Sequence, residues 1–246
     1  MKNRMLKAAL RYAKEGWPVF PLHSVGPKGC TCGDSECSDE GKHPRTAHGF
    51  KDATTDTHIV RIWWKKWPNA NIGIATGTAS GIVVLDIDPR HDGIASLRNL
   101  ERRYGRLPKS HKVRTGGGGQ HHYLDYPGVP IRSRSGIATG IDVRGDGGYI
   151  VAPPSRHKSG KRYRWLGAER PDLSLLPDIP KWLLRLMTQK VSEPSKKTAG
   201  HAILERERNT TLTSLAGAMQ RHGATKGAML AALRKQNRKR CKPPLA

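Results

Sequence analysis

The sequence predicts an α+β fold, in which mixed sheets are flanked by helices, followed by a small α-helical domain. Two observations lead to this prediction. Strand-like and helix-like segments follow one another irregularly, without the strict alternation that is typical of a parallel α/β sheet. The last part of the chain, in contrast, contains only helix-like segments. A chain of 246 residues has room for one large domain and a small second one.

Two amphipathic helices and three strands are expected in the first part of the chain. One helix covers residues 5–16 and stops at Gly16. A second covers 54–68, where Thr55 or Asp56 caps the start and Pro68 ends the helix. The other elements expected here are a strand at 17–22, a loop at 24–50 that is rich in Gly, Cys and His, and strands at 71–77 and 81–88.

In the middle of the chain, a series of short strands is expected between two helices. The expected elements are a helix at 92–105, strands at 112–116, 120–126, 140–145, 148–154 and 161–166, and a helix at 179–189. Residues 190–200 have the composition of a linker. Two further helices are expected at 209–223 and 225–240.

The charge of the chain points to a polyanionic partner. Lys and Arg number 44 against 20 Asp and Glu, which gives a formal net charge of +24. Such an excess is typical of proteins that bind nucleic acid. No apolar run approaches the roughly 20 residues that span a bilayer, and the N-terminus lacks the apolar core of a signal peptide. We therefore expect a cytoplasmic protein.

Two aspartates end the apolar run at residues 82–87. In a strand, Asp86 and Asp88 point to the same face and lie roughly 6.5–7 Å apart. Two carboxylates this close repel unless a positive charge lies between them, and hard divalent cations prefer oxygen ligands. The pair therefore predicts a metal site, although two acids in a solvated turn would leave the same pattern.

Three cysteines and a histidine lie within 14 residues, in a loop with almost no apolar residues. Such a loop cannot be held by core burial, and three thiolates with one imidazole are typical of a structural zinc site. The expected ligands are Cys30, Cys32, Cys37 and His43, with His48 in reserve for the fourth position. Redox-active or unliganded cysteines are the alternative.

A glycine-rich turn precedes a pair of histidines in "RTGGGGQHHYLDY". Glycines let backbone N–H groups approach phosphate oxygens closely. Strand alternation places only one of His121 and His122 on the side of the site. A flexible hairpin with two ordinary histidines is the alternative, and no P-loop motif occurs in the chain.

A third carboxylate, Asp142, lies on a short apolar stretch and can join the acid pair. Three carboxylates can hold two divalent ions that act on a phosphoryl group. Asp146, in "RGDGG", has turn chemistry and is interpreted as structural. The basic and hydroxyl side chains that could hold a triphosphate nearby are Arg144, Ser155, His157 and Lys158.

The order of these motifs resembles the primase–polymerase (prim-pol) family of the archaeo-eukaryotic primase superfamily. The resemblance runs through "AALRYAKEGWPVFPL", "GKHPRTAHGFKDATTD", "WWKKWPNANIGIATG", "GIVVLDIDP", "TGGGGQHHYL" and "GIDVRGDGGYIVAPPSRHKSGKRYRW", roughly residues 8 to 187. It implies that Asp86, Asp88 and Asp142 are the catalytic carboxylates. It also implies that His121, not His122, is the catalytic histidine, through the pattern formed by Thr115, Gly118, Gly119 and His121.

The resemblance also implies the domain organisation and the activity. The expected domains are a catalytic domain at 1–189 with a zinc-binding loop at about 26–48, a linker at 190–200, and a partial primase-type helical module at 201–246. The expected activity is primer synthesis and extension on single-stranded DNA from dNTPs or NTPs, with two Mg²⁺ or Mn²⁺ ions and a structural Zn²⁺. The implied setting is bacterial plasmid, phage or mobile-element replication, with a replicative helicase either on another chain or in a longer parent protein.

Three other functions fit parts of the sequence. A phosphatase of the haloacid-dehalogenase type also uses D-x-D, but it requires Thr or Val where this chain has Arg90. A metal-dependent nuclease also combines clustered acids with a basic surface. A zinc-containing DNA-binding protein without catalytic activity would use the acids structurally. In the family resembled, many relatives have serine where this chain has Gly119, and there the backbone N–H can still bind phosphate.

Overall fold

The computed structural model describes residues 3–27, 29–167, 172, 175–189, 203–204, 208–221 and 225–242. The chain divides into two compact units, Met1–Gln189 and Lys190–Ala246. The expected linker at 190–200 lies outside the described residues. Within the described ranges, none of the helices combines the length and apolar character that crossing a membrane requires.

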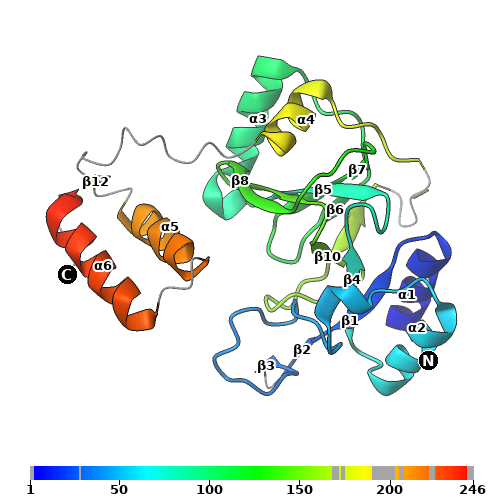
Figure 1. Ribbon diagram of the computed structural model, residues 1–246. Coiled ribbons are helices and arrows are strands. Elements are labelled where there is room, and N and C mark those ends of the chain that lie inside the picture. Colours follow the sequence, from blue (N-terminus) through cyan, green and yellow to red (C-terminus); the bar gives the residue numbers. More distant parts are fainter. Residues whose placement is uncertain are drawn as a thin grey trace. The chain divides into compact units, whose positions relative to one another are not determined.

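The first unit is built around a six-stranded sheet in the order β11-β6-β7-β5-β9-β8 (Figure 1). Every strand pair in it is antiparallel. A smaller sheet, in the order β1-β4-β10, is also antiparallel throughout. The strands are β1 (Val19–Leu22), β4 (Asn71–Ala75), β5 (Ile82–Ile87), β6 (Lys112–Arg114), β7 (Gln120–Asp125), β8 (Arg134–Ala138), β9 (Ile141–Arg144), β10 (Tyr149–Ala152) and β11 (Arg164–Leu166).

The apolar run at 82–87 forms β5, which pairs with β7 on one edge and β9 on the other. Its side chains alternate between two cores: Val84 packs in one, and Val83 and Leu85 pack in the other. The run is therefore continuous because both faces of the strand are covered. The antiparallel pairing corrects the expectation of mixed sheets, since an apolar run reports covered faces and not strand direction.

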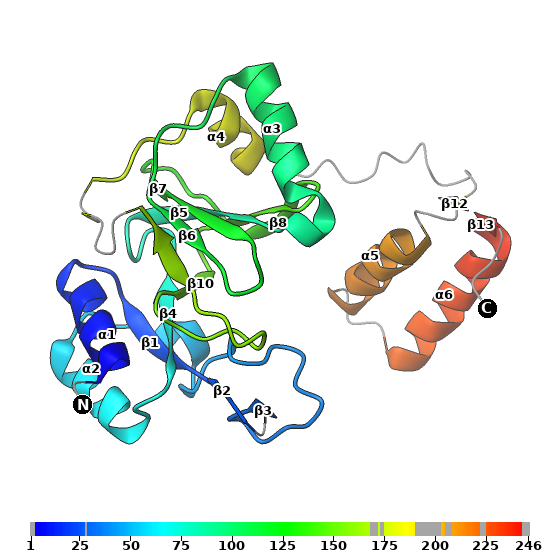
Figure 2. The same ribbon diagram turned by 180° about the vertical axis from the view of Figure 1, so that it is seen from behind.

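Helices cover the two cores from opposite sides. In Figures 1 and 2, α1 (Arg4–Lys14) and α2 (Thr57–Lys66) lie side by side near the smaller sheet. The helices α3 (Gly93–Tyr104) and α4 (Lys181–Thr188) bury Leu97 and Leu183 in the core with Leu85. The expected cap of α2 is confirmed, since the Asp56 carboxylate accepts a hydrogen bond from the His58 N–H at 2.7 Å.

The loop between β1 and α2 carries two short strands, β2 (Val25–Gly26) and β3 (Gly29–Cys30), and the 3₁₀ helix η1 (Gly49–Asp52). A second 3₁₀ helix, η2 (Pro89–His91), follows β5. The sequence did not predict β8, because Arg134–Ala138 lacks an alternating pattern. Gly136 there has φ +68°, and the pairing of β8 with β9 shifts register between Arg134 and Ala138.

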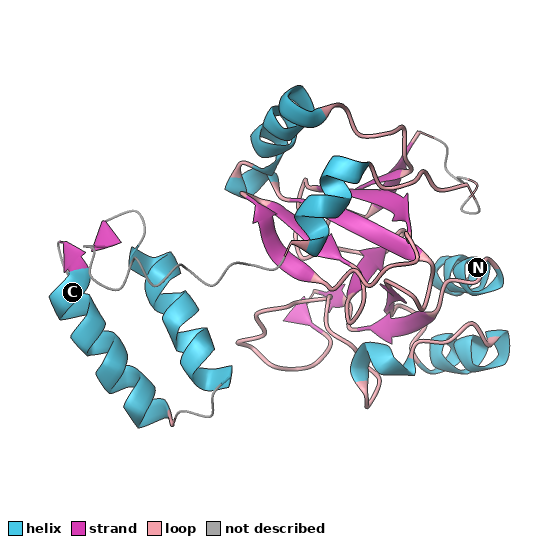
Figure 3. Cartoon of the chain, turned by 45° about the horizontal axis from the view of Figure 1, so that its top comes forward, coloured by secondary structure: helices cyan, strands magenta, loops and turns pink. Residues whose placement is uncertain are grey.

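The described residues of the second unit form the helices α5 (Arg208–Arg221) and α6 (Lys226–Arg240), drawn as coils in Figure 3. The short strands β12 (Ile203–Leu204) and β13 (Cys241–Lys242) pair in parallel. The hydroxyl of Thr225 caps α6 by accepting from the Ala228 N–H at 3.3 Å. Both helices lie close to the ranges that the sequence indicates.

Candidate active site

Three neighbouring strands bring two of the predicted carboxylates and the predicted histidine together. Asp86 on β5 lies opposite His121 on β7 and opposite Asp142 on β9. Residues directly opposite each other in antiparallel strands project to the same face of the sheet. The Nε2 of His121 lies 3.6 Å from Oδ1 of Asp86. The register alone therefore gathers these three side chains.

Arg144, two residues after Asp142, pairs with the carboxylates. Its guanidinium lies 3.1 Å from Oδ2 of Asp142 and 3.7 Å from Oδ2 of Asp86. The same Asp142 also accepts from the Ser135 hydroxyl at 3.1 Å and the Gly136 N–H at 2.9 Å. The structure thus places Arg144 among the acids, and its positive charge offsets their mutual repulsion.

Asp88 lies beyond the end of β5, so the two-residue strand spacing does not set its orientation. Its carboxylate caps η2 by accepting from the Arg90 N–H at 2.9 Å. The Arg90 side chain donates to both of its oxygens, with Nε at 3.0 Å and a terminal nitrogen at 2.7 Å. Chiefly through this side-chain hydrogen bond, Arg90 lowers the pKa of Asp88. Both oxygens of Asp88 are therefore occupied by one arginine.

The glycine-rich turn packs against the end of β5. The Thr115 N–H donates to the Gly119 carbonyl at 2.9 Å, and the Gly118 N–H donates to the Thr115 carbonyl at 3.0 Å. A Cβ atom on Gly119 would lie 2.7 Å from the Ile87 carbonyl oxygen. Residue 119 therefore has to be glycine, because its backbone lies close to β5, the strand that carries Asp86.

These elements enclose a polar cavity of about 80 Å³. Six predicted site residues line it: Asp86, Asp88, Thr115, Gly119, His121 and His157. Three further side chains line the cavity that were not predicted from the sequence, Lys42, Arg90 and Tyr163. Arg90 lies two residues after Asp88 and was open to prediction from sequence. Lys42 and Tyr163 belong to segments far from the acids in the sequence, and no local sequence pattern indicates that they lie at the cavity.

His121 is buried, with 5% of its surface exposed. The next residue, His122, lies opposite Leu85 and therefore on the other face of the sheet. Burial is the main cause that lowers the pKa of His121; Asp86 opposes this effect, and Arg144 and Lys42 add to it. The Nδ1 atom of His121 has no hydrogen-bond partner among the described residues. A neutral imidazole thus lies beside Asp86, able to donate or accept one hydrogen bond in the cavity.

The remaining predicted nucleotide-binding residues differ in position. The His157 ring lies beside the glycine turn, where its Nδ1 contacts the Ser159 hydroxyl at 3.0 Å. Lys158 pairs with Glu40 at 3.7 Å and does not line the cavity. Ser155 is fully buried, and its hydroxyl accepts from the Ile72 N–H at 2.9 Å. Ser155 therefore holds β4 and does not line the cavity, so the structure does not bring it to the other predicted nucleotide-binding residues.

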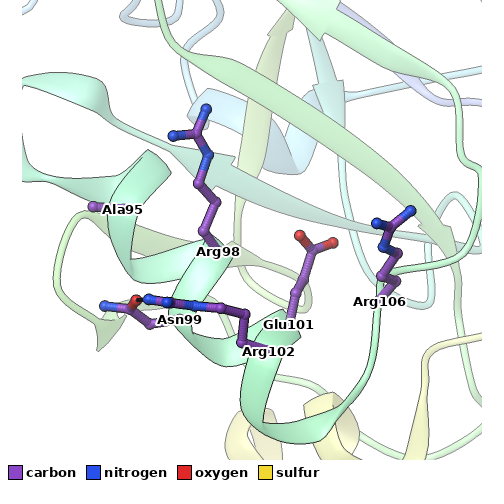
Figure 4. Close-up of a pocket in the computed structure, with 6 residues that line it drawn as sticks. All are labelled: Ala95, Arg98, Asn99, Glu101, Arg102 and Arg106. Atoms are coloured by element: carbon purple, nitrogen blue, oxygen red, sulfur yellow. Dashed lines mark hydrogen bonds between the residues drawn. The ribbon is translucent and has the colours of Figure 1, made fainter.

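A larger cavity, of about 620 Å³, lies on α3 and has a different chemistry (Figure 4). Its lining residues are Ala95, Arg98, Asn99, Glu101, Arg102 and Arg106. Figure 4 shows Arg98, Glu101 and Arg106 projecting in a similar direction, while Arg102 extends along the helix to Asn99. It holds one carboxylate among three guanidinium groups, so it is a basic surface and not a candidate catalytic centre.

The predicted zinc ligands come together in the loop after β1. The ligand atoms of Cys30, Cys32, Cys37 and His43 all lie within 4.8 Å of one another. In tetrahedral zinc geometry, sulfur and nitrogen ligand atoms are about 3.6 Å apart. Here Nε2 of His43 lies 3.4 Å from Sγ of Cys30 and 3.5 Å from Sγ of Cys37. The four residues therefore fit one tetrahedral ion.

The loop also favours a thiolate at one of these cysteines. Burial raises the pKa of Cys30, but hydrogen bonds from the backbone of Cys32 and Gly41 and from His43 together lower it to about 6. A thiolate is the form that binds a metal. His48, the reserve ligand, contacts Asp52 at 2.9 Å instead and takes no part in the cluster.

Two family models match the chain. The first, described as "Bifunctional DNA primase/polymerase, N-terminal", matches residues 9–182. The second, described as "Primase C terminal 1", matches residues 202–246. A search of curated proteins found no match. The first match covers well over half of the chain and includes every residue of the polar cavity.

Proposed function

The chain belongs to the bifunctional DNA primase/polymerase family and carries a primase C-terminal module, and from this premise we propose its reaction. The protein takes part in DNA replication as a primase/polymerase. It joins nucleotides on a single-stranded DNA template, starting from dNTPs or NTPs. A hydroxyl oxygen attacks the α-phosphorus, a new P–O bond forms, and pyrophosphate leaves with the electron pair of the broken bond.

The register of β5 with β7 and β9 is the single observation that supports this proposal most. It places Asp86, His121 and Asp142 on one face of the sheet, beside a cavity that the glycine turn closes. The domain division that we propose is a catalytic domain at 1–189, a linker at 190–200 and a helical module at 201–246, in keeping with the two compact units.

The catalytic carboxylates suit hard divalent ions. Asp86, Asp88 and Asp142 would hold two Mg²⁺ or Mn²⁺ ions, because carboxylate oxygen is the ligand that these ions prefer. Such ions supply charge stabilisation for the triphosphate and lower the pKa of the attacking hydroxyl. Asp88 and Arg90 then have to separate, which frees a guanidinium at the cavity for a phosphate group.

The other cavity residues orient the triphosphate. His121 is held neutral by burial and donates one hydrogen bond to a phosphate oxygen or to Asp86. Gly118 and Gly119 present a backbone without side chains, so that phosphate can approach. Thr115, His157 and Arg144 lie near enough to add polar contacts, and Lys158 lies at the rim. The Cys/His cluster would hold a structural Zn²⁺.

The biological setting is a further part of the proposal. The net charge of +24 supports contact with the phosphates of a template strand. We place the protein in the bacterial cytoplasm, in the replication of a plasmid, phage or other mobile element. A replicative helicase would work with it, and we assign the catalytic domain to the archaeo-eukaryotic primase superfamily.

The test compares the full-length wild type with Asp86→Asn, using Asp125→Asn as the matched control. Asp125 is an exposed acid at the end of β7 and does not line the cavity. Each protein is incubated with single-stranded DNA, labelled nucleotides and Mn²⁺ or Mg²⁺, first without a primer and then with one annealed. We expect short labelled products from the wild type and the control, and a loss of at least about a hundredfold in Asp86→Asn.

Each rival function gives a different result in this assay. Shortening of the labelled template that depends on Asp86 would establish a nuclease. Binding of DNA without synthesis or cleavage, unchanged in Asp86→Asn, would establish a DNA-binding protein. Extension of a primer without any product in its absence would leave a polymerase that does not start chains.

A further inference from the structure

Lys42 reaches the polar cavity from the Cys/His loop. It lies between Gly41 and the cluster residue His43, and it lines the same cavity as Asp86 and His121. The two arginines near the acids already form ion pairs, Arg90 with Asp88 and Arg144 with Asp142. Lys42 has no side-chain hydrogen bond or ion pair within the described part of the chain. Its charge is therefore available to an anion.

The backbone around Lys42 is fastened on both sides. The Lys42 N–H donates to the Asp39 carbonyl at 2.9 Å, and the Lys42 carbonyl accepts from the Tyr149 hydroxyl at 3.1 Å. The Asn71 amide donates to the Gly41 carbonyl at 2.8 Å. Contacts to β4 and β10 thus hold the residue where its side chain enters the cavity.

Gly41 shows how closely this segment packs. Its φ is +71°, a conformation that favours glycine. A Cβ atom there would lie 2.8 Å from a Val25 methyl group and 3.2 Å from the Asn71 amide nitrogen. The tight turn leads directly into Lys42, so the position of this lysine follows from the packing of the loop.

The Cys/His cluster holds the other end of the same segment. The imidazole of His43 contacts two of the cysteines and stacks on His23, with ring centroids 4.3 Å apart. The His23 N–H also donates to the His43 carbonyl at 2.8 Å. An ion bound to the cluster would fix His43, and with it the adjoining Lys42.

We propose that Lys42 binds the triphosphate of the incoming nucleotide, and that the metal-binding cluster sets its position. The proposal rests on the proposed function and names a residue of the same site. An ammonium group at a small polar cavity binds phosphate oxygens through charge-assisted hydrogen bonds. The phosphates of a template strand have the same chemistry, so the experiment has to distinguish them from the triphosphate.

The first experiment measures equilibrium binding by the full chain, without turnover. The proteins are wild type, Lys42→Ala and Lys42→Arg, with Lys51→Ala as the control; Lys51 is an exposed lysine on η1 that does not line the cavity. The ligands are a fluorescent dNTP, the matching dNMP and a single-stranded oligonucleotide. We expect Lys42→Ala to weaken dNTP binding about tenfold and to leave dNMP and oligonucleotide binding unchanged. Lys42→Arg should retain most of the dNTP affinity.

The outcomes separate this proposal from the proposed function. If the wild type binds dNTP no better than dNMP, the proposed function fails and this inference fails with it. If the wild type prefers dNTP and Lys42→Ala matches it, only the role of Lys42 is overturned. A loss of oligonucleotide binding with intact dNTP binding would assign Lys42 to the template strand and overturn the triphosphate assignment.

The second experiment tests the link to the cluster. His43→Ala removes a ligand, whereas His43→Cys keeps four donors and serves as the rescue variant. Zinc content, circular dichroism and dNTP affinity are measured for each. We expect His43→Ala to lose zinc and to bind dNTP as weakly as Lys42→Ala, with no further loss when both changes are combined. Retained zinc and dNTP affinity are expected for His43→Cys.

Two results would contradict the link. Folded His43→Ala that lacks zinc yet binds dNTP like the wild type would show that the cluster does not position Lys42. Additive losses in the double variant would show that the two residues act independently. Should His43→Ala not fold, removal of zinc from the wild type by a chelator, followed by the same dNTP titration, decides between the same outcomes.

Discussion

At the scale of single residues, the site is a set of charges that neutralise one another. Arg90 engages both oxygens of Asp88, and Arg144 bridges Asp86 and Asp142. Each arginine offsets the negative charge of its acid and also competes with any cation for it. The acids were predictable from the sequence, because Asp86 and Asp88 end an apolar run and Asp142 lies on a short apolar stretch. The pairing of Arg90 with Asp88 left no sequence signal, because an arginine two residues away has no fixed orientation outside a strand. Arg144 was expected to bind a triphosphate, and its contact with the acids follows from the pairing of β9 with β5.

Replacing Arg90 should strengthen metal binding. In Arg90→Ala, Asp88 loses its bidentate partner and the cavity loses one positive charge, and both changes favour a divalent ion. Because this ion pair is largely exposed, we expect the affinity for Mn²⁺ to rise only about three- to fivefold. Calorimetric titration with Mn²⁺ measures the effect, and Arg114→Ala, at an exposed position on β6, is the control. Unchanged or weaker Mn²⁺ binding would show that Arg90 does not compete for Asp88.

His122 should make the fold sensitive to acid. Burial is the main cause that lowers its pKa to about 4, and Lys112 and His121 add to the effect. The unfolded chain has a histidine pKa of about 6.5. Between these pH values the unfolded chain binds a proton that the folded chain does not. Stability is therefore full above about pH 6.5 and falls as the pH approaches 4, by about 1–3 kcal/mol for this group.

Thermal unfolding as a function of pH measures this effect. We expect His122→Gln to reduce the fall in the free energy of unfolding between pH 6.5 and pH 4, because the replacement does not titrate. His58→Gln, at an exposed position on α2, should leave the pH dependence as it is in the wild type. Equal pH dependence in all three proteins would rule out His122 as the cause.

At the scale of elements, the turn before β7 and the end of β5 have to fit each other. A side chain at Gly119 would meet the Ile87 carbonyl oxygen at 2.7 Å and the Thr115 hydroxyl at 3.1 Å. Gly117 differs, since a Cβ there would meet the His157 ring at an ordinary 3.5 Å. The two glycines, two residues apart, therefore have different structural roles.

Gly119→Ser should destabilise the fold. The backbone has to shift to admit the Cβ atom, at an expected loss of about 1–3 kcal/mol in the free energy of unfolding. Gly117→Ser is the matched control and should lose less than half as much. Denaturant unfolding measures both variants. Equal stability of the two variants would show that the backbone of the turn can shift to admit a side chain at position 119 without strain.

Elements with a clear local signal were predicted well from sequence. The α2 cap at Asp56 and the apolar run of β5 were found because capping and burial leave patterns in neighbouring residues. The turn role of Asp146 was also found, and its carboxylate accepts from Thr78, Tyr126 and the Ile131 N–H. The strand β8 was missed, because a glycine at positive φ and a register shift leave no alternation.

At the scale of the whole molecule, long-range pairing decides what the sequence cannot show. The cavity combines β5, the turn before β7 and the loop that carries Lys42, which begins far earlier in the chain. The acids and His121 were predictable through their motifs and their resemblance to a family. Lys42 and Tyr163 were not, because only the folded contacts bring them to the site.

The net charge of +24 should act on DNA through particular surfaces and not evenly over the molecule. The basic cavity on α3 is the larger of the two cavities described above, and Arg98 and Arg106 there have no ion pair among the described residues. We therefore expect Arg98→Ala/Arg106→Ala to weaken binding of single-stranded DNA. The slope of log K against log salt should become shallower by about 1.4, which corresponds to two phosphate contacts.

The matched control is Arg61→Ala/Lys65→Ala, which removes the same charge from exposed positions on α2. Fluorescence anisotropy of a labelled oligonucleotide, repeated at several salt concentrations, gives both slopes. If the α3 variant alone changes the slope, phosphates bind at the α3 cavity, and the charge of the remaining surface contributes mainly to long-range attraction. If both variants change it equally, DNA is held diffusely by the net charge, and the α3 cavity has no special role.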